Sequence, residues 1–308
     1  MGRDRGMMRF SKHSLSTHLK LPVPEDFSFI ETLQAHGWPR FLPFSWDENT
    51  GVLERVEQVS DGRIVRITLQ EEEKGCVAVE VSDTADPEEI TRNVRRMLQL
   101  DLPVDAFHTF CTARPELAHV PQRRQGRMLR SPTLWEDTVK VILTTNTTWS
   151  QTKGMVSRFT TQFGAPCPDD PSRHAFPPPE QIAAIPPDDF ADRAKFGYRS
   201  PAVHKLAGEI TSGVMDLEAL QSAEIPAPDL WKRLLALRGV GPYAASCLMI
   251  YLGRYERVNV DSWARMMVSK ELGRPVTDKE VHTFFEPYDE WKALVYHFYR
   301  WKHEEPAY

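Results

Sequence analysis

The chain has 308 residues, of which 41% are hydrophobic and 26% are charged, the composition of a globular protein with one large or two modest cores. Its four cysteines lie too far apart for a CxxC pair, so we expect no cysteine-only zinc site, iron–sulfur cluster or disulfide framework. No run of about 18 apolar residues could span a membrane, and the charged start of the chain is not a secretory signal. The formal net charge of −5, taken alone, argues against a nucleic-acid-binding protein.

The first part of the chain predicts a basic, mobile tail over residues 1–24 and a β-rich domain over 25–105. Near-alternating apolar runs at 52–56 and 64–69 flank Asp61-Gly62, a dipeptide typical of a hairpin turn. The run at 76–81 predicts a third strand. Together these runs indicate a small antiparallel sheet.

The hydrophobic period changes to that of a helix after Asp86-Pro87, a pair that suits a helix N-cap and first turn. Only helices are expected beyond this point, and we place them at 134–145, 150–163, 201–211, 228–237, 242–252, 261–272 and 288–301. The predicted fold class is therefore α+β: a small antiparallel β domain followed by a larger all-helical domain over 106–308.

The most informative segment is Leu237-Arg238-Gly239-Val240-Gly241-Pro242, which predicts a helix end, a Gly-x-Gly turn and a second helix. Glycine permits positive φ and close backbone approach, and the free amides of a helix N-terminus bind phosphate. A bare Gly-x-Gly turn is more often an ordinary helical hairpin. Asp261 follows at the next predicted helix start, where an aspartate is most often an N-cap. A carboxylate beside a phosphate-binding hairpin nevertheless indicates a role on nucleic acid.

This combination resembles the helix-hairpin-helix (HhH-GPD) DNA glycosylase superfamily, with its Gly/Pro-rich loop and essential aspartate. The segments at 126–132, 146–149 and 196–199 are similar to the 8-oxoguanine and 3-methyladenine enzymes, and the aromatic segment at 291–301 resembles the last helix of bacterial 3-methyladenine DNA glycosylase II. The resemblance covers residues 27–301.

The resemblance implies hydrolysis of the N-glycosidic bond of a damaged base that is rotated out of duplex DNA. Asp261 would stabilise the positive charge on the sugar and orient or deprotonate water. Asn146, with Thr147 and Thr148 beside it, would fill the vacated space. Tyr198 and Arg199 would wedge into the duplex or hydrogen-bond the orphaned base; the plain alternatives are a helix cap for Asn146 and a surface residue for Arg199.

The hairpin itself implies further contacts with DNA. The positions expected to contact DNA there or nearby are Arg130, Arg238, Gly239, Val240, Gly241 and Tyr243. The main-chain carbonyls of Leu235, Leu237 and Val240 would hold a sodium or potassium ion, and no other cofactor is expected.

Two departures from the family pattern also matter. Tyr243 stands where bifunctional members carry a lysine, which implies a monofunctional enzyme without lyase activity. Gln151 stands where the 8-oxoguanine enzymes have a second arginine for cytosine.

Two classes of damaged base are candidates for the substrate. Alkylated purines carry positive charge and suit aromatic walls, for which the candidates are Trp46, Trp135, Trp263, Trp291 and Tyr296. A core role is the default for each of these side chains. Among the substrates, our first choice is an alkylated purine and the alternative is 8-oxoguanine. The alternative hypothesis for the function itself is a non-catalytic helix-hairpin-helix DNA-binding protein. The expected partner is duplex DNA with a damaged base, bound by a monomer in the bacterial cytoplasm.

The distribution of charge along the chain weakens the argument that the net charge of −5 makes against nucleic-acid binding. Residues 123–158 carry seven basic and two acidic side chains, whereas 71–89 is strongly acidic. Local charge, rather than the total, sets the field that steers a ligand. We therefore expect salt-sensitive DNA binding on one face of the helical domain.

Overall fold

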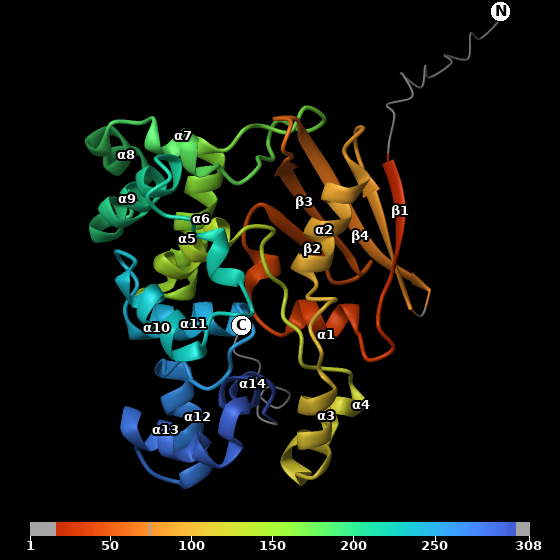
Figure 1. Cartoon of the computed structure of the whole chain (residues 1–308), viewed down its shortest axis with the longest axis vertical. Helices are drawn as coiled ribbons and strands as arrows, with labels where there is room; N and C mark the ends of the chain where they lie inside the picture. The colour runs from red at the N-terminus through yellow and green to blue at the C-terminus, as the bar shows by residue number, and fades with distance from the viewer. Residues whose placement is uncertain (1–16, 74, 300–308) are drawn as a thin grey trace, which may run out of the picture.

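The computed structural model describes residues 17–73 and 75–299 and has an antiparallel sheet on one side of a larger helical body (Figure 1). The predicted α+β fold class is confirmed. The sheet has five strands in the order β1-β5-β4-β3-β2. The strands are β1 (Thr17–Pro22), β2 (Phe44–Asp47), β3 (Val52–Gln58), β4 (Ile64–Glu73) and β5 (Cys76–Val81).

The first strand shortens the tail expected from the sequence. β1 pairs antiparallel with β5 from Thr17 opposite Val81 to Pro22 opposite Cys76, so the prediction of a tail reaching residue 24 is wrong for this segment. Its six residues alternate between more and less exposed side chains. Only Leu19 and Leu21 supply apolar side chains, too few for a sequence signal, and pairing with β5 decides the strand. Residues 1–16 lie outside the described chain.

The hairpin predicted at Asp61-Gly62 is confirmed. The Val59 amide donates to the Arg63 carbonyl at 2.9 Å, and Gly62 has φ +86°, a value that favours glycine. β3 and β4 continue from this turn in antiparallel register. The helix α2 (Pro87–Met97), which starts at the N-cap Asp86, follows the sheet as predicted.

The structure contains helices that the sequence did not predict, in addition to those that it did. α1 (Phe29–Gln34) lies before the second strand, and the helical part comprises α3 (Asp105–Thr112), α4 (His119–Gln122), α5 (Leu134–Thr144), α6 (Trp149–Phe163), α7 (Pro179–Ala183), α8 (Pro187–Ala194), α9 (Ser200–Thr211), α10 (Ala227–Ala236), α11 (Pro242–Tyr251), α12 (Ser262–Leu272), α13 (Asp278–Phe285) and α14 (Lys292–Phe298). The helix predicted from residue 288 starts later because Asp289 has φ +46° and interrupts it. Between residues 17 and 299, Lys74 excepted, no helix has the length and apolarity of a membrane span.

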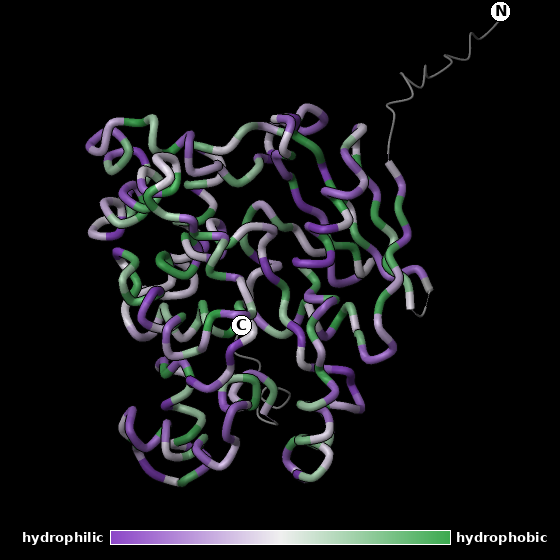
Figure 2. Tube along the Cα trace, viewed as in Figure 1, coloured by the Kyte–Doolittle hydropathy of each residue, from purple (hydrophilic) through white to green (hydrophobic). Residues whose placement is uncertain are grey.

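The sheet and the helices share one large core. Phe44 and Val79 of the sheet belong to the same buried cluster as Val139 of α5 and Leu248 of α11. Hydrophobic residues recur along the strands and along the helices, interspersed with hydrophilic ones (Figure 2). A second cluster joins α3 and α4 to α12, α13 and α14. The chain between α11 and α12 therefore runs from one core to the other, and this position holds Asp261.

Candidate functional site

The glycine-containing turn joins α10 to α11 as the sequence predicts. Gly239 has φ +85°, and a Cβ built there would lie 2.7 Å from the Cβ of Ala202 in α9, so only glycine fits. Gly241 is the N-cap of α11 and offers no side-chain hydrogen bond to the helix. The first amides of α11 therefore have no side-chain cap, and Arg238, Gly239 and Gly241 are exposed beside them. Such a helix end can accept an anion.

Asp261 stands at the start of α12 and serves as its N-cap. Its Oδ1 accepts a hydrogen bond from the Ala264 amide at 2.7 Å and another from the Tyr296 hydroxyl of α14 at 3.1 Å. The side chain is half-buried. The N-cap role expected from the sequence is thus real, and the dipole of α12 favours a negative charge at this position. Both hydrogen bonds use the same oxygen of the carboxylate, so Oδ2 is available for other contacts.

Asp261 faces a small cavity of about 60 Å³ whose walls come from distant parts of the chain. α11 contributes Tyr243, Cys247 and Tyr251 to this Asp261 pocket. The segment after α1 contributes a second wall, and α5, the start of α6 and α14 complete it. The lining residues from outside α11 include His36, Gly37, Trp38, Val141, Trp149, Asn259, Tyr296 and His297.

Trp149 closes the Asp261 pocket against Gly37. A Cβ built on Gly37 would lie 2.0 Å from Cη2 of the Trp149 ring, so the indole requires glycine at this position. The same indole stacks on Phe41 with ring centroids 4.4 Å apart. This packing fixes the first residue of α6 against the segment that follows α1.

His36 is a neutral member of the pocket wall. Its Nε2 lies 2.6 Å from the Leu129 carbonyl, which can only accept, so Nε2 carries the proton. The Trp38 amide donates to Nδ1 at 3.3 Å, which requires an unprotonated nitrogen there. The imidazole also lies against the Trp38 and Tyr251 rings, at centroid distances of 5.0 and 5.4 Å. His36 therefore presents an uncharged aromatic surface.

The nucleophile chemistry of the pocket is limited. Burial raises the pKa of the Cys247 thiol to about 12, so the thiol stays protonated. Tyr243, which hydrogen-bonds that thiol, has no amine. None of the described residues that line the Asp261 pocket is a lysine. Asp261 is thus the group in this cavity best suited to act on a developing positive charge.

The five aromatic residues predicted to form the base wall are spread over several parts of the fold. Of these candidates, Tyr296 alone is among the described residues that line the Asp261 pocket. Trp46 packs against the large core from β2, and Trp135 is 4% exposed and donates from Nε1 to the Pro177 carbonyl at 2.9 Å. Trp263 meets the Tyr296 ring edge-on at 5.7 Å, and Trp291 stacks on Tyr255 at 6.0 Å. These tryptophans fill cores because burial of a large apolar ring is their default stabilising role.

Sequence reasoning missed the aromatic groups that do form the wall. Trp38, Trp149 and Tyr251 surround the cavity together with His36. Residues 36–38 and 149 are separated from Asp261 by more than a hundred positions, and no spacing rule connects them. The one local signal is Gly37 between two ring-bearing residues, because glycine often marks a close approach.

The two loops expected to enter the duplex lie side by side. Asn146 is exposed with φ +46°, and its Nδ2 donates to the Tyr198 hydroxyl at 3.2 Å. Tyr198 is 65% exposed. Thr148 caps α6 and forms a capping box with Gln151, and the Thr147 hydroxyl donates to Gln151 at 3.0 Å. Thr147, Thr148 and Gln151 therefore shape the start of α6.

Arg199 and Arg130 are both largely buried. Arg199 is 8% exposed, which contradicts the alternative of a surface residue, and its contact with an orphaned base stays a prediction. The Arg130 side chain is 11% exposed, with Nε 3.7 Å from Asp137 Oδ2. Burial lowers the pKa of its guanidinium to about 10. Arg130 therefore lies in the interior beside Asp137 of α5, and its contact with phosphate stays a prediction.

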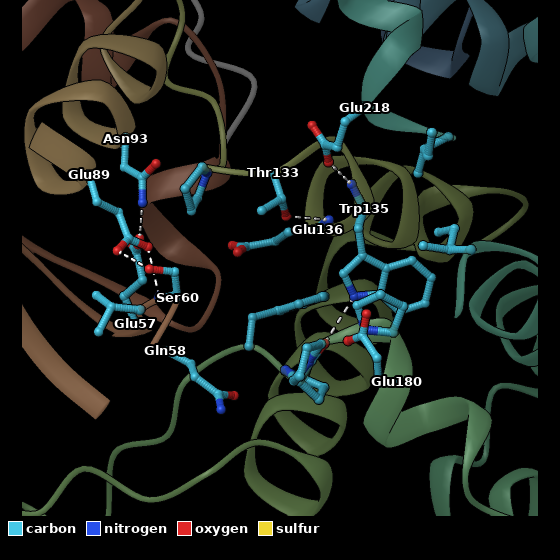
Figure 3. A pocket seen from close by; sticks show the side chains of 18 of the residues that line it. Glu57, Gln58, Ser60, Glu89, Asn93, Thr133, Trp135, Glu136, Glu180 and Glu218 are labelled. Carbon is cyan, nitrogen blue, oxygen red and sulfur yellow. Dashed lines mark hydrogen bonds between the residues drawn. The ribbon is translucent and has the colours of Figure 1, made fainter. Parts of the chain in front are cut away.

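A larger cavity of about 860 Å³ lies between the sheet, α2, α5 and the segment 176–180 (Figure 3). Its labelled side chains include several glutamates, and most of these have protein partners. Glu136 accepts from Lys140 at 2.7 Å and pairs with Arg55 at 3.1 Å, and Glu218 accepts from the Leu134 amide at 2.7 Å. Such a wall repels DNA phosphates. We call this space the acidic cavity.

This chain is similar to known DNA glycosylases in sequence and in structure. No protein-family model matches it. It is 24% identical over 221 residues to a DNA-3-methyladenine glycosylase of Bacillus subtilis (strain 168), covering 70% of this chain and 72% of the relative. The 3-methyladenine DNA-glycosylase of Archaeoglobus fulgidus superposes with a TM-score of 0.72 at 16% identity, covering 92% and 98% of the two chains.

A further solved structure has DNA bound. The Clostridium acetobutylicum 8-oxoguanine glycosylase/lyase in complex with DNA containing cytosine opposite 8-oxoguanine superposes with a TM-score of 0.68 at 18% identity, covering 91% and 92%. At these identities the structural likeness establishes the fold. The chain therefore has the fold of these DNA glycosylases, in agreement with the resemblance that its sequence motifs indicate.

Proposed function

We propose that this protein is a DNA glycosylase that removes a damaged purine, with an alkylated base as the first choice. The observation that carries the proposal is the position of Asp261. It stands at a helix N-terminus, faces an aromatic cavity and follows the α10–α11 hairpin. The curated relative in Bacillus subtilis is a DNA-3-methyladenine glycosylase, which supports the same activity.

The chemistry follows from the carboxylate. As the N-glycosidic bond breaks, its electron pair leaves with the base and positive charge develops on the deoxyribose. Asp261 stabilises this charge and orients a water molecule, whose oxygen bonds to the sugar carbon while its proton passes to the carboxylate. Tyr296 holds Oδ1 at 3.1 Å and so fixes the direction of Oδ2. An alkylated purine already carries positive charge and leaves without prior protonation.

The pocket walls favour an electron-poor base. The rings of Trp38, Trp149, Tyr251 and neutral His36 surround the cavity, and aromatic faces attract cations. The cavity of about 60 Å³ has room for a few water molecules only. A purine therefore enters after part of the wall moves, and Trp149, the first residue of α6, directly follows the exposed loop. 8-Oxoguanine, an uncharged lesion, is the second candidate.

The reaction stops at the abasic site in this proposal. A lyase step needs an amine that attacks the sugar and forms an imine. Tyr243 occupies the matching place in the hairpin, and the described lining of the Asp261 pocket holds no lysine. Sodium borohydride present during turnover should therefore trap no covalent protein–DNA adduct. A trapped adduct would show that an amine from elsewhere in the chain reaches the sugar.

The hairpin is proposed to bind the DNA backbone through its amides and a monovalent cation. The carbonyls of Leu235, Leu237 and Val240 would hold the ion. The last carbonyls of α10 lack partners within the helix, and Leu237 accepts one bond from the Val240 amide at 3.1 Å and keeps a second lone pair. Carbonyl oxygens are ligands that suit such an ion. When bound, the ion would neutralise a phosphate next to Arg238.

The test is base release from duplex oligonucleotides. One panel carries 3-methyladenine analogues, 7-methylguanine, hypoxanthine or 8-oxoguanine, and free base is measured by mass spectrometry. We expect release from the alkylated duplexes first, by a monomer, with rates that fall as salt rises. Tight duplex binding without release of any base would support the alternative, a non-catalytic DNA-binding module.

A further inference from the structure

Arg199 is a buried cation whose partners lie on the exposed loop before α6. It ends the 3-10 turn Gly197–Arg199 and is 8% exposed. Its Nη2 donates to the Thr145 carbonyl and, at 3.2 Å, to the Asn146 carbonyl. Its Nε donates to the Thr145 hydroxyl at 3.3 Å, and Nη1 donates to the Phe196 carbonyl at 3.3 Å. All three nitrogens of the guanidinium thus donate to groups of this protein, namely three backbone carbonyls and the Thr145 hydroxyl.

These bonds hold a backbone conformation that is uncommon outside glycine. Asn146 has φ +46°, in the left-handed region, which asparagine adopts more often than most other side chains. The two carbonyls that Arg199 holds flank this residue. A planar guanidinium has several donors in a fixed arrangement, so it can hold both carbonyls at once. Arg199 therefore stabilises the turn that points Asn146 outward.

The same guanidinium supports the other exposed loop. Its Cζ lies 4.4 Å from the centroid of the Tyr198 ring, a cation–π contact. The Tyr198 hydroxyl in turn accepts from Asn146 Nδ2 at 3.2 Å. Asn146 and Tyr198, the two outward-pointing side chains, are therefore joined to each other directly and through Arg199.

We propose that Arg199 is a positioning residue: it presets the Asn146–Tyr198 pair for entry into the duplex and does not read the base opposite the lesion. This inference rests on the proposed glycosylase function. Gln151, the other side chain expected near that base, is also engaged, because its Oε1 accepts from the Thr148 amide at 3.1 Å and from the Thr147 hydroxyl at 3.0 Å. The Arg199 guanidinium and the Gln151 side-chain oxygen are therefore both engaged within the protein. The protein then removes its lesion with little regard to the opposite base.

The first experiment uses the wild-type protein and one lesion placed opposite each of the four bases. Single-turnover rates at saturating protein should agree within about threefold, because loss of one specific base contact would change them by tenfold or more. A rate at least tenfold higher opposite one base would overturn the inference. Absence of base release from all four duplexes would instead contradict the proposed function.

The second experiment separates positioning from general stability. Arg199→Gln should lower the saturating rate by about tenfold or more, equally for all four opposite bases, because displaced groups lose rate rather than specificity. Its effect on binding of undamaged duplex should be much smaller. Arg199→Lys should restore part of the rate, because an ammonium still donates to carbonyls but cannot hold two at fixed geometry. Fluorescence of a 2-aminopurine next to the lesion should report slower flipping in Arg199→Gln.

Arg193→Gln is the matched control. Arg193 is exposed on α8, donates to the Gln162 carbonyl at 3.3 Å and lies 4.7 Å from the Phe163 ring centroid. It makes the same types of contact away from the loop, so its replacement should leave the rate and the 2-aminopurine signal unchanged. A rate loss confined to one opposite base in Arg199→Gln, or an equal loss in the control, would overturn the positioning role. The wild-type comparison remains decisive if Arg199→Gln does not fold.

Discussion

The acidic cavity and the Asp261 pocket differ in size and in how their carboxylates are held. The acidic cavity, at about 860 Å³, has several carboxylates, whereas the described residues that line the Asp261 pocket, at about 60 Å³, include one. Glu136 in the larger space lies between two cations, Arg55 and Lys140. Asp261 is held by two neutral donors, the Ala264 amide and the Tyr296 hydroxyl. A carboxylate already paired with cations stabilises the fold, and one held by neutral groups keeps its charge for a ligand.

The charge balance around Glu136 gives the contrast a physical basis. Burial by itself raises the pKa of Glu136, but the attraction of Arg55 and Lys140 outweighs this and lowers the pKa to about 2. The side chains of Arg55, Glu136 and Lys140 are 3%, 2% and 0% exposed, so the network is nearly dry. It connects β3 to α5 and thereby the sheet to the helical part. Removing one member leaves an uncompensated buried charge.

The largest effect on activity is expected from Asp261→Asn. Asparagine still caps α12, so folding and duplex binding should be unchanged. Loss of the negative charge should lower the single-turnover rate by about a thousandfold. Thermal melting and a binding titration on undamaged duplex supply the comparison. A variant that retains a tenth of the wild-type rate would remove Asp261 from the reaction.

Glu136→Gln should lower stability and leave the catalytic rate unchanged, the opposite of what is expected for Asp261→Asn. It leaves Arg55 and Lys140 short of a counter-charge in a buried site and should cost about 3–5 kcal/mol of unfolding free energy. The rate per folded molecule should match wild type. Urea unfolding measures the first quantity and an active-site-normalised assay the second. Glu180→Gln, an exposed change at the rim of the same cavity, is the control and should leave both unchanged.

The same network predicts a dependence on pH. Glu136 has a folded pKa of about 2, below its ordinary value of 4.5, so its stabilisation is present above pH 4.5 and is lost as pH falls toward 2. Glu57 acts in the opposite sense, because burial outweighs the attraction of Arg55 and raises its pKa. Unfolding free energy measured between pH 6 and 3 should fall less steeply in Glu136→Gln than in wild type. Equal slopes would show that Glu136 does not govern acid stability.

Tyr296→Phe should have an intermediate effect on catalysis. It removes one hydrogen bond to a carboxylate, worth about 1.5–3 kcal/mol, so the rate at saturation should fall by roughly ten- to a hundredfold with little change in KM. Tyr255→Phe is the matched control, since the buried Tyr255 hydroxyl has no hydrogen-bond partner among the described residues. The two variants should differ in rate while melting within a few degrees of each other. Equal rates would mean that Tyr296 does not orient Asp261.

The smallest effect on base release is expected from Gly37→Ala. The new methyl group would lie 2.0 Å from the Trp149 ring, so the indole must shift, at a cost of about 1–3 kcal/mol in stability. The displaced indole should also weaken release of alkylated bases. Gly154→Ala lies in α6 with no atom within 4 Å of the new methyl group and should be neutral or stabilising. A wild-type rate in Gly37→Ala would separate Trp149 from base selection.

Local chemistry made the hairpin and its aspartate predictable. α10, α11 and α12 begin or end within about one residue of the positions inferred from glycine, proline and N-cap signals. Gly239 needs positive φ, and Asp261 caps a helix, and both requirements are visible in a short stretch of sequence. The same local signals placed the hairpin at Asp61-Gly62 correctly. The α+β class followed from the change of hydrophobic period.

Tertiary structure decided what surrounds those elements. A local pattern states what a residue's own backbone requires, but burial depends on which distant surface it meets. Arg199 was expected at the DNA and is instead folded onto the Thr145 and Asn146 carbonyls. The pocket wall comes from Trp38 and Trp149 rather than from the predicted tryptophans, because these segments meet only in the folded chain. The sequence by itself thus determined the hairpin and the helix-capping position of Asp261, and packing determined the cavity that this carboxylate faces.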